Sequence, residues 1–385
     1  MDRITRRSIL ASSLTPMLLR SRPLSAQTTP SGYLLYVGTY TNKTSKGIYA
    51  FRFQSESGDL MPLGLVAETP NPTYLALSAN HRFLYAVNEE SNYQGTHSGL
   101  VSSFAIDHLT AKLKPLNSVA SAGSGPCHLA VDHTGSDLFV ANYGSGSAAS
   151  FRLSPTGLIG APVSQFQFSG HGPDAKRQEG PHAHCTTVSP DNRYVLVNDL
   201  GLDRIVVYRL DPATAKLTPN DPPYWSAKPG SGPRHLAFHP KEPFAYSVNE
   251  MASTVDVLGW DSQTGTLTSI QNISALPQDF HGESTAAEIV VDPTGRFVYS
   301  SNRGHNSIAM FAVDRARGTL TSLGFAATPG REPRNFTLDP TGRWVLVGNQ
   351  MIGTISLFRR DLETGMLSPA GKTTSIDQAV SILFV

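Results

Sequence analysis

Arg234 and Glu250 are the residues of this sequence best placed for chemistry, because they stand at the two ends of one short motif. The motif begins at Gly230, and its two apolar runs, separated by a turn near Pro240, predict a tight β-hairpin. Such a hairpin brings its ends together, so we expect the arginine and the carboxylate to face one another. A carboxylate can take a proton from water, and a guanidinium group can hold a developing oxyanion.

Versions of this motif recur along the chain, and each has an asparagine fourteen residues after its start. The starts are Tyr74, His128, His184, His235, Glu288 and Asn335, and the asparagines are Asn88, Asn142, Asn198, Asn249, Asn302 and Asn349. Each copy predicts two strands, and a third and a fourth strand follow it. Four short strands per unit, at a period of roughly fifty residues, predict a β-propeller. We expect the repeated asparagine to be structural and to satisfy backbone groups where the strand ends.

The first unit is split between the two ends of the chain. Residues 33–69 supply its second, third and fourth strands, and residues 379–385 form a strand with nothing after it. If this last strand lies innermost in the first unit, the ring closes without an exposed strand edge. The sequence therefore predicts an all-β, seven-bladed β-propeller, with four antiparallel strands per blade, that occupies residues 33–385 as one domain.

The polar ends of the motifs are expected to meet at one mouth of the central channel. The first strand of each blade starts, and the second ends, on one face near the axis. The three longest loops, residues 89–99, 170–183 and 275–287, belong to this face, and loops over a rigid scaffold carry function. The polar residues expected there include His128, His182, His184, Arg234, His235, Glu250, Glu288, Arg303, Arg334 and Asn335. We therefore place the active site at this mouth.

Composition limits the classes of partner that the protein can have. The chain has 385 residues and a net charge of +1, with no extended basic run in its body. This balance argues against nucleic acid or an anionic membrane surface as the main partner. The two cysteines, Cys127 and Cys185, are too few for a disulfide framework and lack the spacing of a metal site. We expect both to be small buried residues.

The N-terminus has the pattern of an export signal. Arg6 and Arg7 form a twin-arginine pair, an apolar run continues to Leu19, and a plausible cleavage site ends at Ala26. The apolar run is too short for a permanent membrane helix. We expect residues 1–26 to be a twin-arginine signal peptide, and the mature protein to be periplasmic or secreted without stable membrane insertion. If the signal is not used, the protein stays cytoplasmic.

The sequence resembles the seven-bladed lactonase family, which includes propeller-type 6-phosphogluconolactonases and carboxy-muconate lactonising enzymes. The resemblance extends from about Tyr33 to Val385. Its most specific segments are residues 232–235, 248–250, 287–289, 301–303 and 333–335. It implies a catalytic set of one histidine, two arginines and one glutamate, with no metal or organic cofactor. Carried over by motif, this set is His184 (or its neighbour His182), Arg234, Glu250 and Arg303. We expect His128, His182, His235, Glu288, Arg334 and Asn335 to bind substrate.

Hydrolysis of a sugar-acid lactone is the function that these residues favour. Glu250 or His184 would take a proton from water, and the sequence does not choose between them. Arg234 and Arg303 would hold the oxyanion and any phosphate or carboxylate of the substrate. The alternatives are lactone formation from a muconate-like diacid, and a non-catalytic propeller that binds a ligand at its mouth. We expect a small-molecule lactone as the partner and a monomeric protein; the sequence does not fix whether the lactone is phosphorylated.

A central calcium ion is used by other lactonase propellers. Here its ligands would be Asp199, Asn198, Glu250 and Glu288. Arginines are interleaved with these residues and disfavour a cation at that position. We therefore expect metal-free chemistry.

Overall fold

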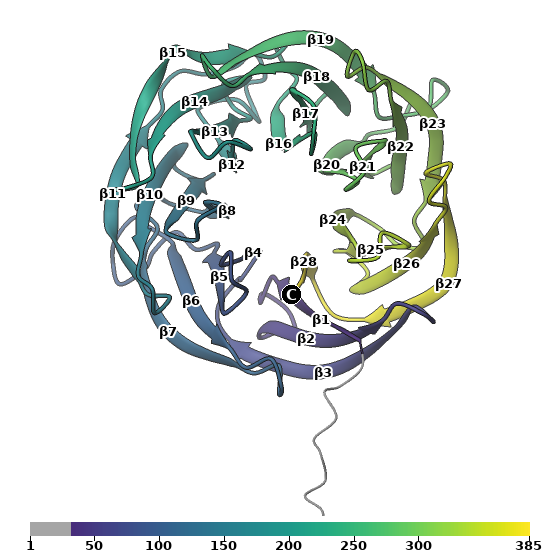
Figure 1. The fold of residues 1–385 in the computed structure, drawn as a ribbon, viewed down its shortest axis with the longest axis horizontal. Coiled ribbons are helices and arrows are strands. Elements are labelled where there is room, and N and C mark those ends of the chain that lie inside the picture. The colour runs from purple at the N-terminus through teal and green to yellow at the C-terminus, as the bar shows by residue number, and fades with distance from the viewer. Residues whose placement is uncertain (1–31) are drawn as a thin grey trace, which may run out of the picture. The chain divides into compact units, whose positions relative to one another are not determined.

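The computed structural model describes residues 32–385, which form a ring of seven four-stranded antiparallel sheets around a central axis (Figure 1). The prediction of an all-β, seven-bladed propeller is confirmed. Across residues 32–385, no helix has the length and apolar character needed to cross a membrane. The predicted signal peptide, residues 1–26, lies outside the described residues.

The blades follow one another in chain order. In blades 2–7 the first strand lies next to the axis, and in blade 1 this place is taken by the last strand of the chain (Figure 1). Blade 1 contains β28 (Ala379–Phe384), β1 (Tyr33–Thr39), β2 (Gly47–Gln54) and β3 (Asp59–Glu68), and blade 2 contains β4 (Tyr74–Leu77), β5 (Phe83–Asn88), β6 (Leu100–Ile106) and β7 (Leu113–Ala120). Blade 3 contains β8 (Pro126–Val131), β9 (Asp137–Asn142), β10 (Ser147–Leu153) and β11 (Ile159–Gln167), and blade 4 contains β12 (Ala183–Val188), β13 (Tyr194–Asp199), β14 (Arg204–Asp211) and β15 (Lys216–Ser226). Blade 5 contains β16 (Pro233–Phe238), β17 (Phe244–Asn249), β18 (Thr254–Asp261) and β19 (Thr266–Ser274), and blade 6 contains β20 (Thr285–Val291), β21 (Phe297–Arg303), β22 (Ser307–Val313) and β23 (Leu320–Ala327). Blade 7 contains β24 (Pro333–Leu338), β25 (Trp344–Asn349), β26 (Thr354–Arg360) and β27 (Leu367–Ser375).

The last strand closes the ring as predicted. β28 pairs antiparallel with β1, so that Val37 lies opposite Ile382, and Figure 1 shows the yellow C-terminal strand beside the purple first blade. Ile382 is buried and packs with Trp344 and Leu346 of blade 7. The apolar surface buried between these blades therefore includes residues from both ends of the chain.

Adjacent blades are also linked by buried tyrosines on their second strands. The hydroxyl of Tyr246 in blade 5 donates a hydrogen bond to the carbonyl of Gly318 in blade 6, at 3.1 Å. The hydroxyl of Tyr299 in blade 6 donates in the same way to Gly365 in blade 7, at 2.8 Å. A buried phenol needs a partner for its hydroxyl. These bonds therefore hold the turn between the third and fourth strands of one blade against the neighbouring blade.

The repeated asparagine has the structural role that its recurrence predicts. All six copies have a relative exposure of 0%. The amide groups of Asn88, Asn142 and Asn302 donate to the carbonyls of Pro70, Ser121 and Ala275, which precede the innermost strands. In the other three blades the amide donates to serine, threonine or aspartate side chains. The asparagine thus ties the end of the second strand to its surroundings.

Candidate active site

A bulge near the start of the innermost strand directs two successive side chains toward the axis. The pairing register shifts between Pro126 and His128, Ala183 and Cys185, Pro233 and His235, Ala286 and Ile289, and Pro333 and Asn335. A bulge sets two residues opposite one, which interrupts the normal alternation of side chains. The axis is therefore lined by two layers of side chains.

The first layer faces a cavity of about 300 Å³, which we call the mouth cavity. Its lining residues are Tyr40, Glu89, Cys127, Tyr143, Arg177, His184, Glu250, Thr285, Arg303 and Arg334. Glu89 and Arg177 come from two of the three long loops, and Thr285 is the first residue of β20, directly after the third. The expectation that these loops surround the same mouth is confirmed.

Glu250 lines the mouth cavity and contacts three guanidinium groups. Its Oε1 accepts a hydrogen bond from Nη2 of Arg177 at 2.6 Å. Its Oε2 lies 2.9 Å from Nε of Arg234 and 2.8 Å from Nη2 of Arg303. The ends of the predicted hairpin therefore meet, and one buried carboxylate is shared among three cations.

These cations make Glu250 a weak proton acceptor. Burial opposes ionisation of the carboxyl group, but Arg303, Arg234 and Arg177 outweigh it and hold the pKa of Glu250 far below its ordinary value. A carboxylate in this state takes up a proton only at very low pH. Both oxygens of Glu250 are engaged by guanidinium groups, whereas Nδ1 of His184 has no partner among the described residues, so Glu250 is the less suited of the two candidate bases.

His184 presents an uncharged imidazole to the same cavity. Its Nδ1 is buried and has no hydrogen-bond partner among the described residues. Burial, the charge of Arg234 and the neighbouring His235 hold the pKa of His184 well below 6.5. The ring is therefore neutral at pH 7, and an imidazole that lines the cavity can exchange a proton with a molecule bound there.

Arg334 faces the cavity next to a tyrosine and a second carboxylate. Its Nη2 donates to the hydroxyl of Tyr40 at 3.2 Å, and its guanidinium group lies 5.5 Å from the centre of the Tyr40 ring. The same hydroxyl donates to Glu89 at 2.9 Å, and Glu89 also accepts from Thr73. Within residues 32–385, no carboxylate oxygen lies within 4.0 Å of the Arg334 guanidinium group. Its remaining N–H groups can thus bind an anion.

His182 lies behind the mouth cavity and does not line it. Its ring stacks on Tyr143 with 4.4 Å between ring centres, and its Nδ1 donates to the Tyr143 carbonyl at 3.1 Å. Tyr143 in turn contacts Arg177 through its hydroxyl, at 3.5 Å. His182 therefore supports the wall of the cavity, whereas His184 faces its interior.

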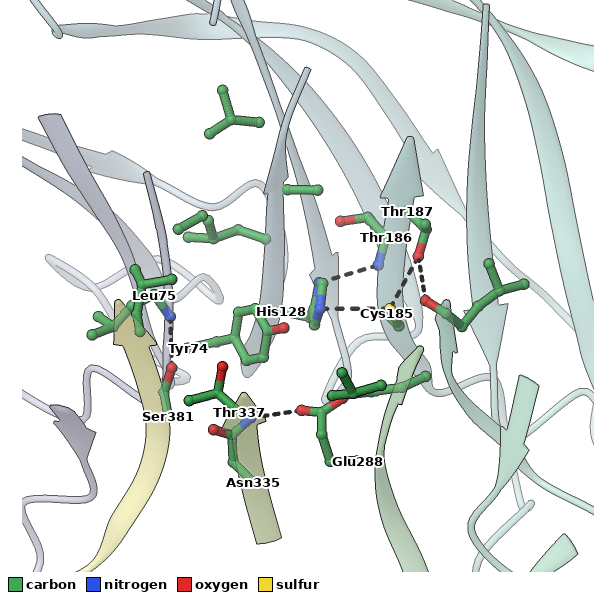
Figure 2. Close-up of a pocket in the computed structure, with 18 of the residues that line it drawn as sticks. Tyr74, Leu75, His128, Cys185, Thr186, Thr187, Glu288, Asn335, Thr337 and Ser381 are labelled. Atoms are coloured by element: carbon green, nitrogen blue, oxygen red, sulfur yellow. Dashed lines mark hydrogen bonds and ion pairs between the residues drawn. The ribbon is translucent and has the colours of Figure 1, made fainter. Parts of the chain in front are cut away.

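Four predicted mouth residues belong instead to the second layer. His128, His235, Glu288 and Asn335 line a different cavity of about 440 Å³, which extends toward the short turns of the other face and which we call the opposite cavity (Figure 2). These four residues do not line the mouth cavity with Glu250, and their assignment to substrate binding stays a prediction. Arg234 reaches the mouth through its bond to Glu250 but does not line the mouth cavity; with His235 it borders a small void between the two layers.

Packed rings separate the two cavities on the axis. His235 contacts His184 above it, with 5.1 Å between ring centres, and lies equally close to His128. Tyr74 packs against His128 at 3.9 Å. Cys127 and Cys185 occupy the first and second layers respectively and are buried and free, as expected for small core residues.

The four side chains of the calcium alternative are engaged separately. Asn198 donates to Ser247, and Asp199 accepts from the backbone amides of His182 and Leu202. Glu250 is surrounded by arginines, and Glu288 belongs to the second layer. Residues 32–385 contain no group of three His, Cys, Asp or Glu side chains arranged to hold a metal ion.

Sequence reasoning did not place Tyr40 or Arg177 at the mouth, and it placed Tyr143 there as a strand-end residue without a role. The signal for the two tyrosines was available, because each directly follows the end of the second strand of its blade. The equivalent positions in the seven blades are Tyr40, Glu89, Tyr143, Asp199, Glu250, Arg303 and Gln350. Five of these seven line the mouth cavity. Arg177 has no such signal, since it lies within the loop that joins β11 to β12.

A closed seven-bladed ring with a polar, cationic mouth cavity defines a propeller of the ligand-binding or enzymatic class. Residues 34–384 match the family model described as "Lactonase, 7-bladed beta-propeller", and the chain belongs to this family. It is 38% identical to a 6-phosphogluconolactonase of Bacillus subtilis, over 79% of this chain and 84% of that protein. It is 35% identical to a 6-phosphogluconolactonase of Formosa agariphila, over 79% and 86%. The solved structure of a periplasmic gluconolactonase of Pseudomonas aeruginosa superposes with a TM-score of 0.86 at 34% identity, covering 92% of this chain and 99% of that one.

Proposed function

We propose that this protein hydrolyses a sugar-acid lactone in the mouth cavity. The observation that carries the proposal is the pairing of a neutral imidazole, His184, with guanidinium groups around one cavity. Ring opening needs a base for water, a site for the oxyanion and a proton for the leaving oxygen. The names of the relatives, 6-phosphogluconolactonase and gluconolactonase, agree with this chemistry.

His184 takes a proton from the attacking water, whose oxygen forms a bond to the acyl carbon. The carbonyl oxygen becomes an oxyanion, which Arg303 stabilises. When the intermediate collapses, the ring C–O bond breaks and protonated His184 returns its proton to the leaving oxygen. Glu250 aligns the arginines as their counter-ion and does not act as the base.

The charge of the site favours an anionic lactone. Arg177, Arg234, Arg303 and Arg334 bring four positive charges to the mouth, whereas Glu89 and Glu250 bring two negative ones. The excess of positive charge suits a substrate that carries a phosphate or carboxylate group. We assign this group to Arg334 and to the partly exposed Arg177, because both have N–H groups that face the cavity.

Proton release from purified protein tests the activity directly. We expect acid release above the spontaneous rate with 6-phosphogluconolactone and with gluconolactone, and no loss of it when a chelator is added. Absence of release with both lactones would contradict the proposal. Loss of activity on chelation would contradict the metal-free mechanism.

Replacing Arg334 with methionine is expected to raise KM for 6-phosphogluconolactone by about 10–100-fold, which corresponds to one charge-assisted hydrogen bond. KM for uncharged gluconolactone should change much less, because gluconolactone has no phosphate group for Arg334 to bind. Initial rates for both substrates measure the difference. Arg331→Met, an exposed arginine near the same mouth, is the matched control and should leave both values unchanged. An equal rise for both lactones would contradict the assignment of Arg334 to the anionic group.

We further propose that the protein is exported through the twin-arginine route and acts as a periplasmic or secreted monomer. The motif at Arg6-Arg7 supports the route, and the similar Pseudomonas aeruginosa protein is described as periplasmic. Fractionation of cells that express the full chain should give a shorter, periplasmic product. With both arginines changed to lysine, the protein should stay in the cytoplasm at full length. Light scattering on the mature protein measures its mass.

A further inference from the structure

A chain of hydrogen bonds connects the mouth cavity to the second layer of side chains. Arg234 bonds Glu250 through Nε and approaches Nε2 of His235 through Nη1 at 3.1 Å. Nδ1 of His235 lies 2.8 Å from Oε1 of Glu288. Oε2 of Glu288 accepts from the amide of Asn335 at 2.6 Å, which Figure 2 shows. The chain crosses three blades, and each of its members has a relative exposure below 8%.

The donors in this chain fix the tautomer of His235. Arg234 has only N–H donors, so Nε2 of His235 must accept, and the ring proton must lie on Nδ1. That proton is donated to the carboxylate of Glu288, which also accepts from the backbone N–H of Ile289 at 3.0 Å. Burial and the charge of Arg234 lower the pKa of His235, so the ring is neutral. Along the chain of hydrogen bonds the charge is therefore negative at Glu288, neutral at His235 and positive at Arg234.

Arg234 is held on three sides by this arrangement. Glu250 lies on its mouth side, His235 lies beneath it, and the carbonyl of Ala287 accepts from its Nη1 at 2.7 Å. The ring of His235 also packs against His184, with 5.1 Å between ring centres. The orientation of His235 thus affects Arg234, which holds Glu250 in place, and His184, which the proposed reaction uses.

We propose that Glu288 and His235 are positioning residues, which orient Arg234 and His184 for catalysis without touching the substrate. This inference rests on the proposed lactone hydrolysis for its kinetic consequence, but the tautomer that it requires is independent of any substrate. It replaces the expectation that these two residues bind substrate. The closest analogy in physical terms is a carboxylate that fixes the tautomer of a catalytic histidine.

Glu288→Gln tests the proposal with little change in shape. A glutamine amide can donate to Nδ1 of His235, which stabilises the other tautomer and places an N–H against Arg234. We expect kcat to fall about 10–100-fold with KM within about twofold, as for other groups that orient a histidine. In protein labelled with ¹⁵N-histidine, the His235 resonances should show a proton on Nδ1 in the wild type and lose that form in the variant. The His235 signals are identified by their absence in His235→Gln.

Matched variants separate positioning from simple loss of structure. Thr337→Val changes another residue of the opposite cavity that lies outside the chain, and it should leave kcat unchanged. His235→Gln offers one acceptor and one donor, so it should keep more activity than His235→Leu.

Three results would overturn the inference: a proton on Nε2 in the wild type, an unchanged kcat in Glu288→Gln, or a rise in KM alone, which would mean substrate contact. If the wild type opens no lactone, the proposed function fails, and the tautomer measurement still decides the position of His235.

Discussion

Replacing His184 with glutamine is expected to lower kcat for lactone hydrolysis by about 100- to 10,000-fold, the usual contribution of a general base. Glutamine keeps polar atoms in the cavity but cannot take a proton from water. KM should change little, because the arginines that hold the substrate remain in place. Steady-state rates on 6-phosphogluconolactone measure the loss.

The pH dependence of kcat in the wild type also tests whether His184 is the base. The base must be unprotonated, and burial together with Arg234 lowers the pKa of His184 well below 6.5. Activity should therefore persist as the pH falls through 6.5, and the acid limb of kcat should lie below that of an ordinary histidine. In His184→Gln this limb should disappear.

His182→Gln is the matched control, because His182 lies behind Tyr143 and outside the mouth cavity. We expect it to lower kcat less than tenfold, through a small displacement of the cavity wall. A larger loss for His182→Gln than for His184→Gln would contradict our assignment and make His182 the base.

The ring and its closure are predictable from sequence, because their signals are local. Strand pairs separated by short turns rich in Pro, Asp, Asn and Gly repeat along the chain, and a lone final strand such as β28 has only the split first blade to join. The meeting of Arg234 with Glu250 follows from hairpin geometry for the same reason. Each of these inferences needs only the period of the pattern and the chemistry of a turn.

The division of the polar residues into two layers is not predictable in this way. Normal strand alternation sends successive residues to opposite faces, whereas the bulge at Pro233–His235 directs Arg234 and His235 both inward, at different depths. The sequence shows pairs of polar residues at the starts of the innermost strands, but it does not show the bulge that places the two residues of a pair in different layers. Arg177 is not predictable for another reason. It lies in a long loop, and the repeat pattern of the sequence does not show where a loop places its side chains.

Glu250→Gln is expected to lower the free energy of unfolding by about 3–5 kcal/mol, because it removes the counter-ion of a buried cluster of guanidinium groups. Arg177, Arg234 and Arg303 would then lie close together with only hydrogen bonds to a neutral amide. Urea titration followed by circular dichroism measures the loss. Glu363→Gln, which changes a carboxylate whose side chain is 86% exposed, is the control and should change stability by less than about 0.5 kcal/mol.

The difference in the free energy of unfolding between the wild type and Glu250→Gln should decrease only as the pH falls. The folded state lowers the pKa of Glu250, so its stabilising contribution is full above about pH 4.5 and decreases as the pH falls below that value toward the folded pKa. The stability gap to the variant should therefore narrow in acid.

A variant of unchanged stability that has nevertheless lost kcat would mean that Glu250 is the base after all, because a counter-ion cannot be removed without a cost in stability. A variant that is both less stable and less active agrees with the counter-ion role, provided that His184→Gln loses activity while remaining stable. The two variants together thus separate the group that accepts the proton from the group that holds the arginines in place.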